Sequence, residues 1–221
     1  MTAWLFFAVI AVYLLCGLVS PFPYGRTYWM LWRVVLAAPG TWYAKRRQAA
    51  FLLKAGLGMP IWTFFWYLDE LLYADYRRQE IKPVFIIGQP RCGTTFLHRT
   101  LAADRQTFFA IRHLEWRYPF IAVQKLIALL GLDKNLGGVN YWPKTEAGQQ
   151  AAKMHPNTLA DWEEDGIFFE ENFLHHFFIF LRFPYPGLLK YVDSFPELPE
   201  HVQKRMLDVY VRTLQKVQFL R

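Results

Sequence analysis

The apolar positions divide the chain into a long hydrophobic N-terminal part and a later part with short, separate apolar runs. Residues 3–19 form an uninterrupted run without a charged side chain. A helix that crosses a bilayer needs about 20 apolar residues, so this run is short but sufficient. It lacks the leading positive charge and the small-residue cleavage site of a secretory signal peptide. We predict a membrane-anchoring helix here, with a buried or interfacial helix as the alternative.

Positive charges follow this predicted anchor, at Arg26, Arg33, Lys45, Arg46 and Arg47. By the positive-inside rule, they predict that the body of the protein faces the cytoplasm. Residues 29–76 are rich in aromatics and are interrupted at Pro39-Gly40 and Met59-Pro60. Because Trp and Tyr favour the headgroup region, we interpret this stretch as an interfacial or re-entrant helical hairpin. A helix that covers the core is the alternative.

The pattern changes after Pro83. Residues 84–87 are a short run of β-branched and aromatic residues with Gly88 directly after it, which indicates a buried parallel strand. Helical spacing follows over residues 95–103, and residues 108–111 resemble a second strand. We therefore predict an α/β fold, an incomplete P-loop-like parallel sheet flanked by helices. A helical membrane region, 1–81, precedes this second region, 82–221.

Three further helices are expected in the second region. Residues 119–132 are apolar nearly all round, and this helix is expected to end at Gly131 or soon after it. A second helix is expected over residues 161–181, because Asp161 and Glu164 have capping-box spacing. A third, opened by Ser194 and Glu197, is expected to continue to the end of the chain.

The loop after the first predicted strand carries the candidate chemistry. It reads Gly88-Gln89-Pro90-Arg91-Cys92-Gly93-Thr94-Thr95. A strand, a glycine-containing loop and a helix N-terminus together form a phosphate cradle of backbone amides. Both glycines and the final threonine fit the P-loop pattern, but Thr94 replaces the lysine that serves β- and γ-phosphates. This argues against an ordinary kinase or ATPase, while Arg91 supplies a cation earlier in the loop.

A cysteine phosphatase would need an arginine that follows its cysteine after five intervening residues. From Cys92 this spacing reaches His98, and Arg99 comes one position late. Two cysteines in dissimilar settings indicate neither a disulfide nor a metal site. The formal net charge of +7 favours anionic ligands, but no basic run with interleaved aromatics indicates nucleic acid.

Residues 83–104 resemble the 5′-phosphosulfate loop of the PAPS-dependent sulfotransferases, in the Pro-Arg-Ser-Gly-Thr-Thr form of the bacterial and membrane-associated branches. Cys92 replaces the usual serine, which keeps the backbone cradle and removes one hydroxyl. The resemblance implies 3′-phosphoadenylyl sulfate as donor and requires no metal. It places the donor's 5′-phosphate against the backbone amides of Arg91, Cys92, Gly93, Thr94 and Thr95. The Thr94 and Thr95 hydroxyls contribute, and Arg91 neutralises the leaving phosphate.

The resemblance also implies a base that takes a proton from the acceptor. Glu115 fits best, because the residues that follow it are similar to a Trp-Glu then Phe-Pro stretch of the family. His113 is the competitor, having an ordinary pKa better suited to proton transfer. For each residue, a surface charge that pairs with Arg112 or Arg117 is an equally weighted alternative.

The acceptor is expected to be a lipid-linked, glycolipid or carbohydrate hydroxyl, or an amine, because the chain is expected at a membrane. The resemblance covers the first half of a sulfotransferase domain, and no match to the 3′-phosphate site occurs before Arg221. A truncated or inactive membrane protein is therefore an alternative, as is a P-loop-like kinase. A homo-oligomer is left open.

Overall fold

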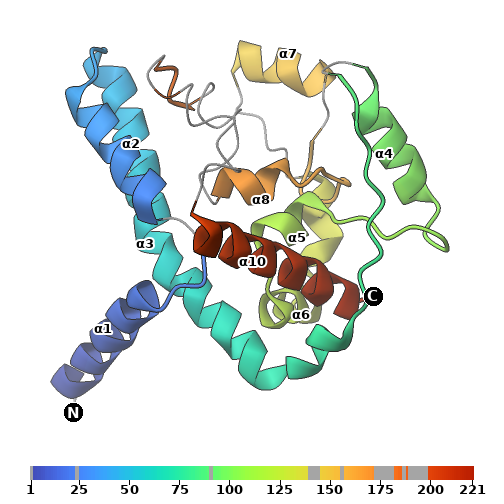
Figure 1. Cartoon of the computed structure of the whole chain (residues 1–221), viewed down its shortest axis with the longest axis horizontal. Coiled ribbons are helices and arrows are strands. Elements are labelled where there is room, and N and C mark those ends of the chain that lie inside the picture. Colours follow the sequence, from blue (N-terminus) through green and yellow to red (C-terminus); the bar gives the residue numbers. More distant parts are fainter. Residues whose placement is uncertain are drawn as a thin grey trace. The chain divides into compact units, whose positions relative to one another are not determined.

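The structure, a computed structural model, describes residues 2–22, 25–89, 92–138, 145–154, 157–171, 182–185, 188 and 199–221. Helices dominate these residues (Figure 1). The α-helices are α1 Thr2–Leu18, α2 Gly25–Ala37, α3 Trp42–Leu72, α4 Thr94–Ala103, α5 His113–Arg117, α6 Ile121–Leu129, α7 Glu146–Met154, α8 Gly166–Glu171 and α10 Glu200–Phe219. Two 3₁₀-helices are η1 Ala74–Arg78 and η2 Leu132–Gly138.

The predicted parallel sheet is wrong for the described part of the chain, which contains no strand. Residues 79–89 have no regular secondary structure, and the side chains of Val84, Phe85 and Ile87 are 64%, 79% and 93% exposed. The second predicted strand has only one isolated antiparallel bridge nearby, between Arg112 and Trp162. A β-branched run favours extended backbone, but a sheet also needs a neighbour that accepts its hydrogen bonds. The local pattern does not specify that neighbour.

The chain forms two compact units. One contains residues 1–71 and 168–210, and the other contains residues 72–167 and 211–221. The division at residues 81 and 82 stays a prediction, because no observation tests it.

The first unit contains α1, α2 and most of α3. Its core consists of six buried residues, which are Tyr28, Leu31, Val35, Leu52, Phe183 and Leu188. The buried side chain of Gln48 donates to the Arg182 carbonyl at 2.7 Å and accepts from the Tyr185 hydroxyl at 2.7 Å. The core therefore combines apolar packing with a satisfied amide.

The interruptions predicted in this unit have different outcomes. The break at Pro39-Gly40 is confirmed, since α2 ends at Ala37 and α3 begins at Trp42. The break at Pro60 is wrong, because α3 continues through it. A proline removes one helical hydrogen bond, but Pro60 is buried, and its packing and neighbouring contacts offset that loss.

One helix in the described ranges, α3, is long and apolar enough to cross a membrane, by length and composition only. The predicted anchor, α1, is among the shorter apolar helices. A single such helix is weak evidence of a membrane span, because the core helix of a soluble protein passes the same test.

The second unit packs α5 and α6 with the C-terminal part of α10. Its buried residues include Trp116, Phe120 and Ile121. The Gln124 side chain donates to the Tyr118 carbonyl at 2.9 Å, which ties α6 to the segment before it. The helix was expected to end at Gly131 or soon after it, but α6 ends at Leu129, and Gly131, with a φ of 66°, lies in the turn that follows.

The other two expected helices begin later than predicted. The helix expected over residues 161–181 begins at Gly166 as α8 and is described as far as Glu171, while residues 172–181 lie outside the described residues. The last helix, α10, begins at Glu200, and its predicted caps Ser194 and Glu197 lie outside the described residues.

Candidate functional site

The glycine loop is tightly wound where it enters α4. The Cys92 amide donates to the Gln89 carbonyl at 3.2 Å, and Gly93 has a φ of 93°. A Cβ at Gly88 would lie 2.5 Å from Cys92 Sγ and 3.0 Å from Thr94 Cγ2. Real Cβ atoms do not approach another atom as closely as 2.5 Å, so any larger residue at position 88 would force the Cys92 side chain to move. The helix predicted after the loop is confirmed as α4, which begins at Thr94.

The beginning of α4 presents backbone donors next to this turn. The first amides of an α-helix have no carbonyl partner within the helix and lie at its positive end. The Leu97 amide, which donates to the Gly93 carbonyl at 3.0 Å, makes the first helical bond. The loop and the helix N-terminus are therefore suited to an anion. Pro90 and Arg91 lie outside the described residues, so the role of Arg91 stays a prediction.

A short acidic segment, residues 161–165, lies against α4. The Thr95 hydroxyl donates to Glu164 Oε1 at 2.6 Å. Burial lowers the pKa of His98, on the same helix, and the neighbouring Arg99 also lowers it, while Glu164 and Asp165 act in the opposite direction. The second predicted threonine of the loop is thus bonded to a carboxylate. Sequence reasoning treated this carboxylate only as a helix cap.

Glu163 has the most perturbed carboxyl group of this segment. Burial raises its pKa from 4.5 to about 7, and the negative charges of Glu164 and Asp161 add to this effect. The Glu164 amide, 3.4 Å from Glu163 Oε1, and the charge of Arg99 oppose the shift. A carboxyl group with this pKa can both accept and release a proton near neutral pH. The sequence feature that could have indicated this carboxyl group is the presence of four acidic residues within the five positions 161–165.

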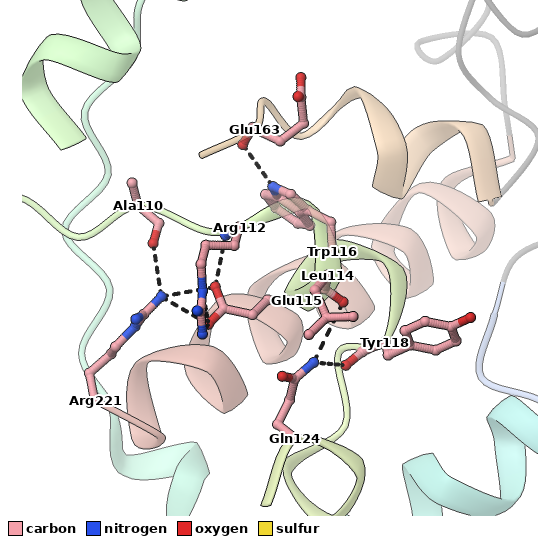
Figure 2. Close-up of polar contacts among 9 residues, drawn as sticks. All are labelled: Ala110, Arg112, Leu114, Glu115, Trp116, Tyr118, Gln124, Glu163 and Arg221. Carbon is pink, nitrogen blue, oxygen red and sulfur yellow. Dashed lines mark hydrogen bonds and ion pairs between the residues drawn. The ribbon is translucent and has the colours of Figure 1, made fainter. Parts of the chain in front are cut away.

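The acidic segment also contacts the part of the chain that begins α5. The Glu163 amide donates to the Ile111 carbonyl at 3.0 Å, and Trp116 Nε1 donates to the Glu163 carbonyl at 3.0 Å (Figure 2). The His113 amide donates to the Asp161 carbonyl at 2.9 Å. The segment therefore connects the helix of the glycine loop with the helix that carries the predicted bases.

Glu115 is held at the start of α5 by two arginines (Figure 2). Its side chain is 3% exposed and accepts the Arg112 amide at 2.7 Å, as in a capping box. The Arg112 guanidinium donates to Oε1 at 2.9 Å and 3.2 Å. Arg221 Nη2 lies 2.9 Å from both oxygens. The alternative of a pair with Arg112 is therefore observed, in a buried setting.

These contacts bear on the predicted role of Glu115. A carboxylate that accepts several charge-assisted hydrogen bonds is held in one position by them. Burial lowers the pKa of Arg221, while Glu115 acts in the opposite direction. The geometry is that of a structural anion, and the role of general base stays a prediction.

His113 is fully buried two residues before Glu115. Its Nδ1 lies 2.8 Å from Asn157 Oδ1, a pair that fixes the orientation of the ring. The structure therefore places both predicted bases on α5 and orients each by a specific partner.

The amino-acid sequence around this site matches the model of a known protein family. The family model with the description "Sulfotransferase family" matches residues 83–178. This segment, which is less than half of the chain, is similar to the sulfotransferase family. The match includes the glycine loop, α4, α5 and the acidic segment. No curated protein and no solved structure matches the chain.

The family match supports transfer of a sulfuryl group, the reaction class of a transferase, as the general chemistry of this segment. The glycine loop fits the phosphate of a donor, because a Cβ at Gly88 would fill the turn and the N-terminus of α4 supplies donors. Among the described residues, no group of three His, Cys, Asp or Glu side chains could hold a metal ion.

Proposed function

We propose that this chain transfers the sulfuryl group of 3′-phosphoadenylyl sulfate to a hydroxyl or amine of an acceptor. The observation that carries the proposal is the tight turn from Gly88 to Gly93, followed by the N-terminus of α4, within the segment that matches the sulfotransferase family. The turn provides backbone amides for a phosphate, and the family supplies the reaction class.

In this proposal the 5′-phosphate of the donor binds the amides of residues 92–95 and the hydroxyls of Thr94 and Thr95. Arg91 neutralises the negative charge that develops on the leaving phosphate. These contacts stabilise spread negative charge and hold the reacting atoms in line. Thr95 now donates to Glu164. Its single proton must change partner when the phosphate binds.

The acceptor oxygen or nitrogen attacks sulfur, and a new bond to sulfur forms as the bond between sulfur and the phosphate oxygen breaks. Adenosine 3′,5′-bisphosphate (PAP) leaves with the electron pair, and the acceptor's proton passes to a base. Glu115 and His113 are the bases proposed from the sequence. We add Glu163, because its half-buried carboxyl group has a pKa near neutrality and lies in the segment that contacts α4.

The acceptor in this proposal is a lipid-linked or carbohydrate compound. The large apolar surface of the N-terminal helices supports a location at a membrane, where such acceptors occur. The basic composition, with a formal net charge of +7, favours acceptors and donors that carry phosphate or sulfate.

A thermal-shift titration of the detergent-purified chain tests the donor. A ligand that binds only the folded state must raise the melting temperature. We expect PAP to stabilise the chain and ATP with Mg²⁺ to have a smaller effect. Stabilisation by ATP with Mg²⁺ alone would instead identify a nucleotide kinase, and no response to either would favour an inactive or incomplete protein.

A further inference from the structure

The surface of α1 is apolar on every side. The helix contains no charged residue over its 17 positions. Trp4, Leu5, Phe6 and Phe7 are between 63% and 81% exposed. Successive residues of an α-helix point about 100° apart, so these four cover its circumference. A helix that is hydrophobic all round is suited to the interior of a large protein or to a membrane.

Two tyrosine hydroxyls join α1 to α3. The Tyr13 hydroxyl donates to the Leu57 carbonyl at 2.7 Å, and the Tyr67 hydroxyl donates to the Val19 carbonyl at 2.9 Å. Between these bonds, a Cβ at Gly17 would lie 3.5 Å from Pro60 Cγ, an ordinary van der Waals distance, so the C-terminal part of α1 lies beside Pro60. The two helices therefore meet through two hydrogen bonds and an apolar contact near Pro60.

The two hydroxyls bind carbonyls at or next to places where a helix lacks a backbone partner. Pro60 has no N–H, which leaves the Gly56 carbonyl without its helical donor, and Tyr13 donates to the next carbonyl along, that of Leu57. Tyr67 donates to the Val19 carbonyl, just after the end of α1. In a bilayer, backbone polar groups must find partners within the protein because no water is present. The bond from Tyr67 meets this requirement at the end of α1.

The charges of α3 lie outside its apolar part. Residues 55–68 contain no charged side chain, which corresponds to about 21 Å of helix. Lys45, Arg46 and Arg47 precede this part, and Asp69 and Glu70 follow it. Lys54, at its edge, is exposed and long enough to reach the headgroups. Basic residues beside an apolar helix attract anionic lipid headgroups.

We infer that α1 and the apolar part of α3 insert together into the hydrocarbon of a lipid bilayer, joined by the two tyrosine hydrogen bonds. The basic residues at the beginning of α3 lie at an anionic headgroup surface. The apolar part of α3 and the whole of α1 are each somewhat shorter than a bilayer core, and local thinning accommodates such a difference. This inference uses no property of the donor site.

The test is vesicle flotation of the full chain, synthesised in the presence of phosphatidylcholine vesicles with or without phosphatidylserine. We expect the chain to float with both kinds of vesicle, to float more completely with the anionic ones, and to resist washing with salt and alkaline carbonate. Release by salt would show surface adsorption only, and absence from the floated fraction would show that another protein surface covers α1. Either result overturns the inference.

The two cysteines provide a second measurement on the unaltered chain. Cys16 lies in α1 and Cys92 is exposed in the other unit. A water-soluble maleimide, located by mass spectrometry, should label Cys92 in vesicles and label Cys16 only after the bilayer is dissolved in a denaturing detergent. Equal labelling of both thiols in intact vesicles would place α1 in water and contradict the inference.

A pair of variants distinguishes insertion of α1 into the bilayer from non-specific adsorption through exposed apolar side chains. Phe6→Lys with Leu14→Lys places two charges on α1, where both side chains are at least 60% exposed. Leu129→Lys with Leu130→Lys changes two equally exposed leucines at the end of α6. We expect only the α1 variant to lose carbonate resistance. Loss in both variants, or in neither, would overturn the inference, and PAP binding by the same samples reports separately on the donor site.

Discussion

Glu164, which accepts a hydrogen bond from Thr95, is expected to weaken the binding of a phosphate by the loop, because its negative charge repels the phosphate. A phosphate oxygen that accepts from the Thr95 hydroxyl would lie about 5 Å from the Glu164 carboxylate, which is now 2.6 Å from that hydroxyl. Glu164→Gln removes the negative charge and keeps an acceptor for Thr95. We expect this variant to bind PAP more tightly than the wild type.

The magnitude follows from the geometry. Two unit charges about 5 Å apart repel by about 0.8 kcal/mol at the dielectric constant of water. A phosphate monoester carries close to two charges, and physiological salt, with a Debye length of about 8 Å, screens about half of the resulting repulsion. Because Glu164 is exposed, no further gain from burial applies. About 0.8 kcal/mol remains, which is about a fourfold decrease in Kd.

Isothermal titration with PAP measures this change directly. Glu146→Gln, at an exposed position in α7, changes the net charge equally and serves as the control. The gain for Glu164→Gln should diminish at high salt, because screening weakens the repulsion. An unchanged or weakened affinity of Glu164→Gln, or an equal gain in Glu146→Gln, would refute the reasoning.

Three further predictions concern the same unit. Gly88→Ala should weaken PAP binding at least about tenfold, because its Cβ would lie 2.5 Å from Cys92 Sγ. Gly58→Ala, where a Cβ would meet open space, should leave PAP binding unchanged. Equal PAP affinities of the two variants in titrations would contradict this prediction. Glu163 binds more protons when folded, so wild-type stability should fall as pH rises from 4.5 through about 7, by at most about 3 kcal/mol, in urea titrations. The stability of Glu163→Gln should not decrease over this pH range. A pH dependence of stability equal to that of the wild type would contradict the raised pKa of Glu163. Glu115→Gln should lower the melting temperature, because it removes the buried anion that Arg112 and Arg221 share. A normal melting temperature together with lost transfer would instead support Glu115 as the base.

The sequence predicted the features that depend on local chemistry. The helix after the loop and the break at Pro39-Gly40 follow from turn residues and helical spacing. The predicted break at Met59-Pro60 is wrong, because α3 continues through Pro60. Tyr13 and Gly17 of α1, which are far away in the sequence, contact the helix around this proline.

The predicted sheet failed for a related reason. Residues 84–87 have the composition of a strand, but pairing depends on a second segment that composition does not identify. In the candidate site, the helix that follows the loop was predictable from the order of residues along the chain, and the binding role of the loop residues stays a prediction. The contact of Glu164 with Thr95 was not, because it joins residues 69 positions apart. The raised pKa of Glu163 depends on burial, which only the folded chain determines.

The central claim is that the glycine loop binds the donor of a sulfuryl transfer. The most direct test is transfer of radiolabelled sulfate from 3′-phosphoadenylyl sulfate to a membrane lipid extract by the vesicle-inserted chain, with Gly88→Ala and Gly58→Ala in parallel. The account predicts labelled product with the wild type and Gly58→Ala and a large loss with Gly88→Ala. Labelled product at the same rate from Gly88→Ala would contradict it, as would PAP binding at a site that this substitution leaves unchanged.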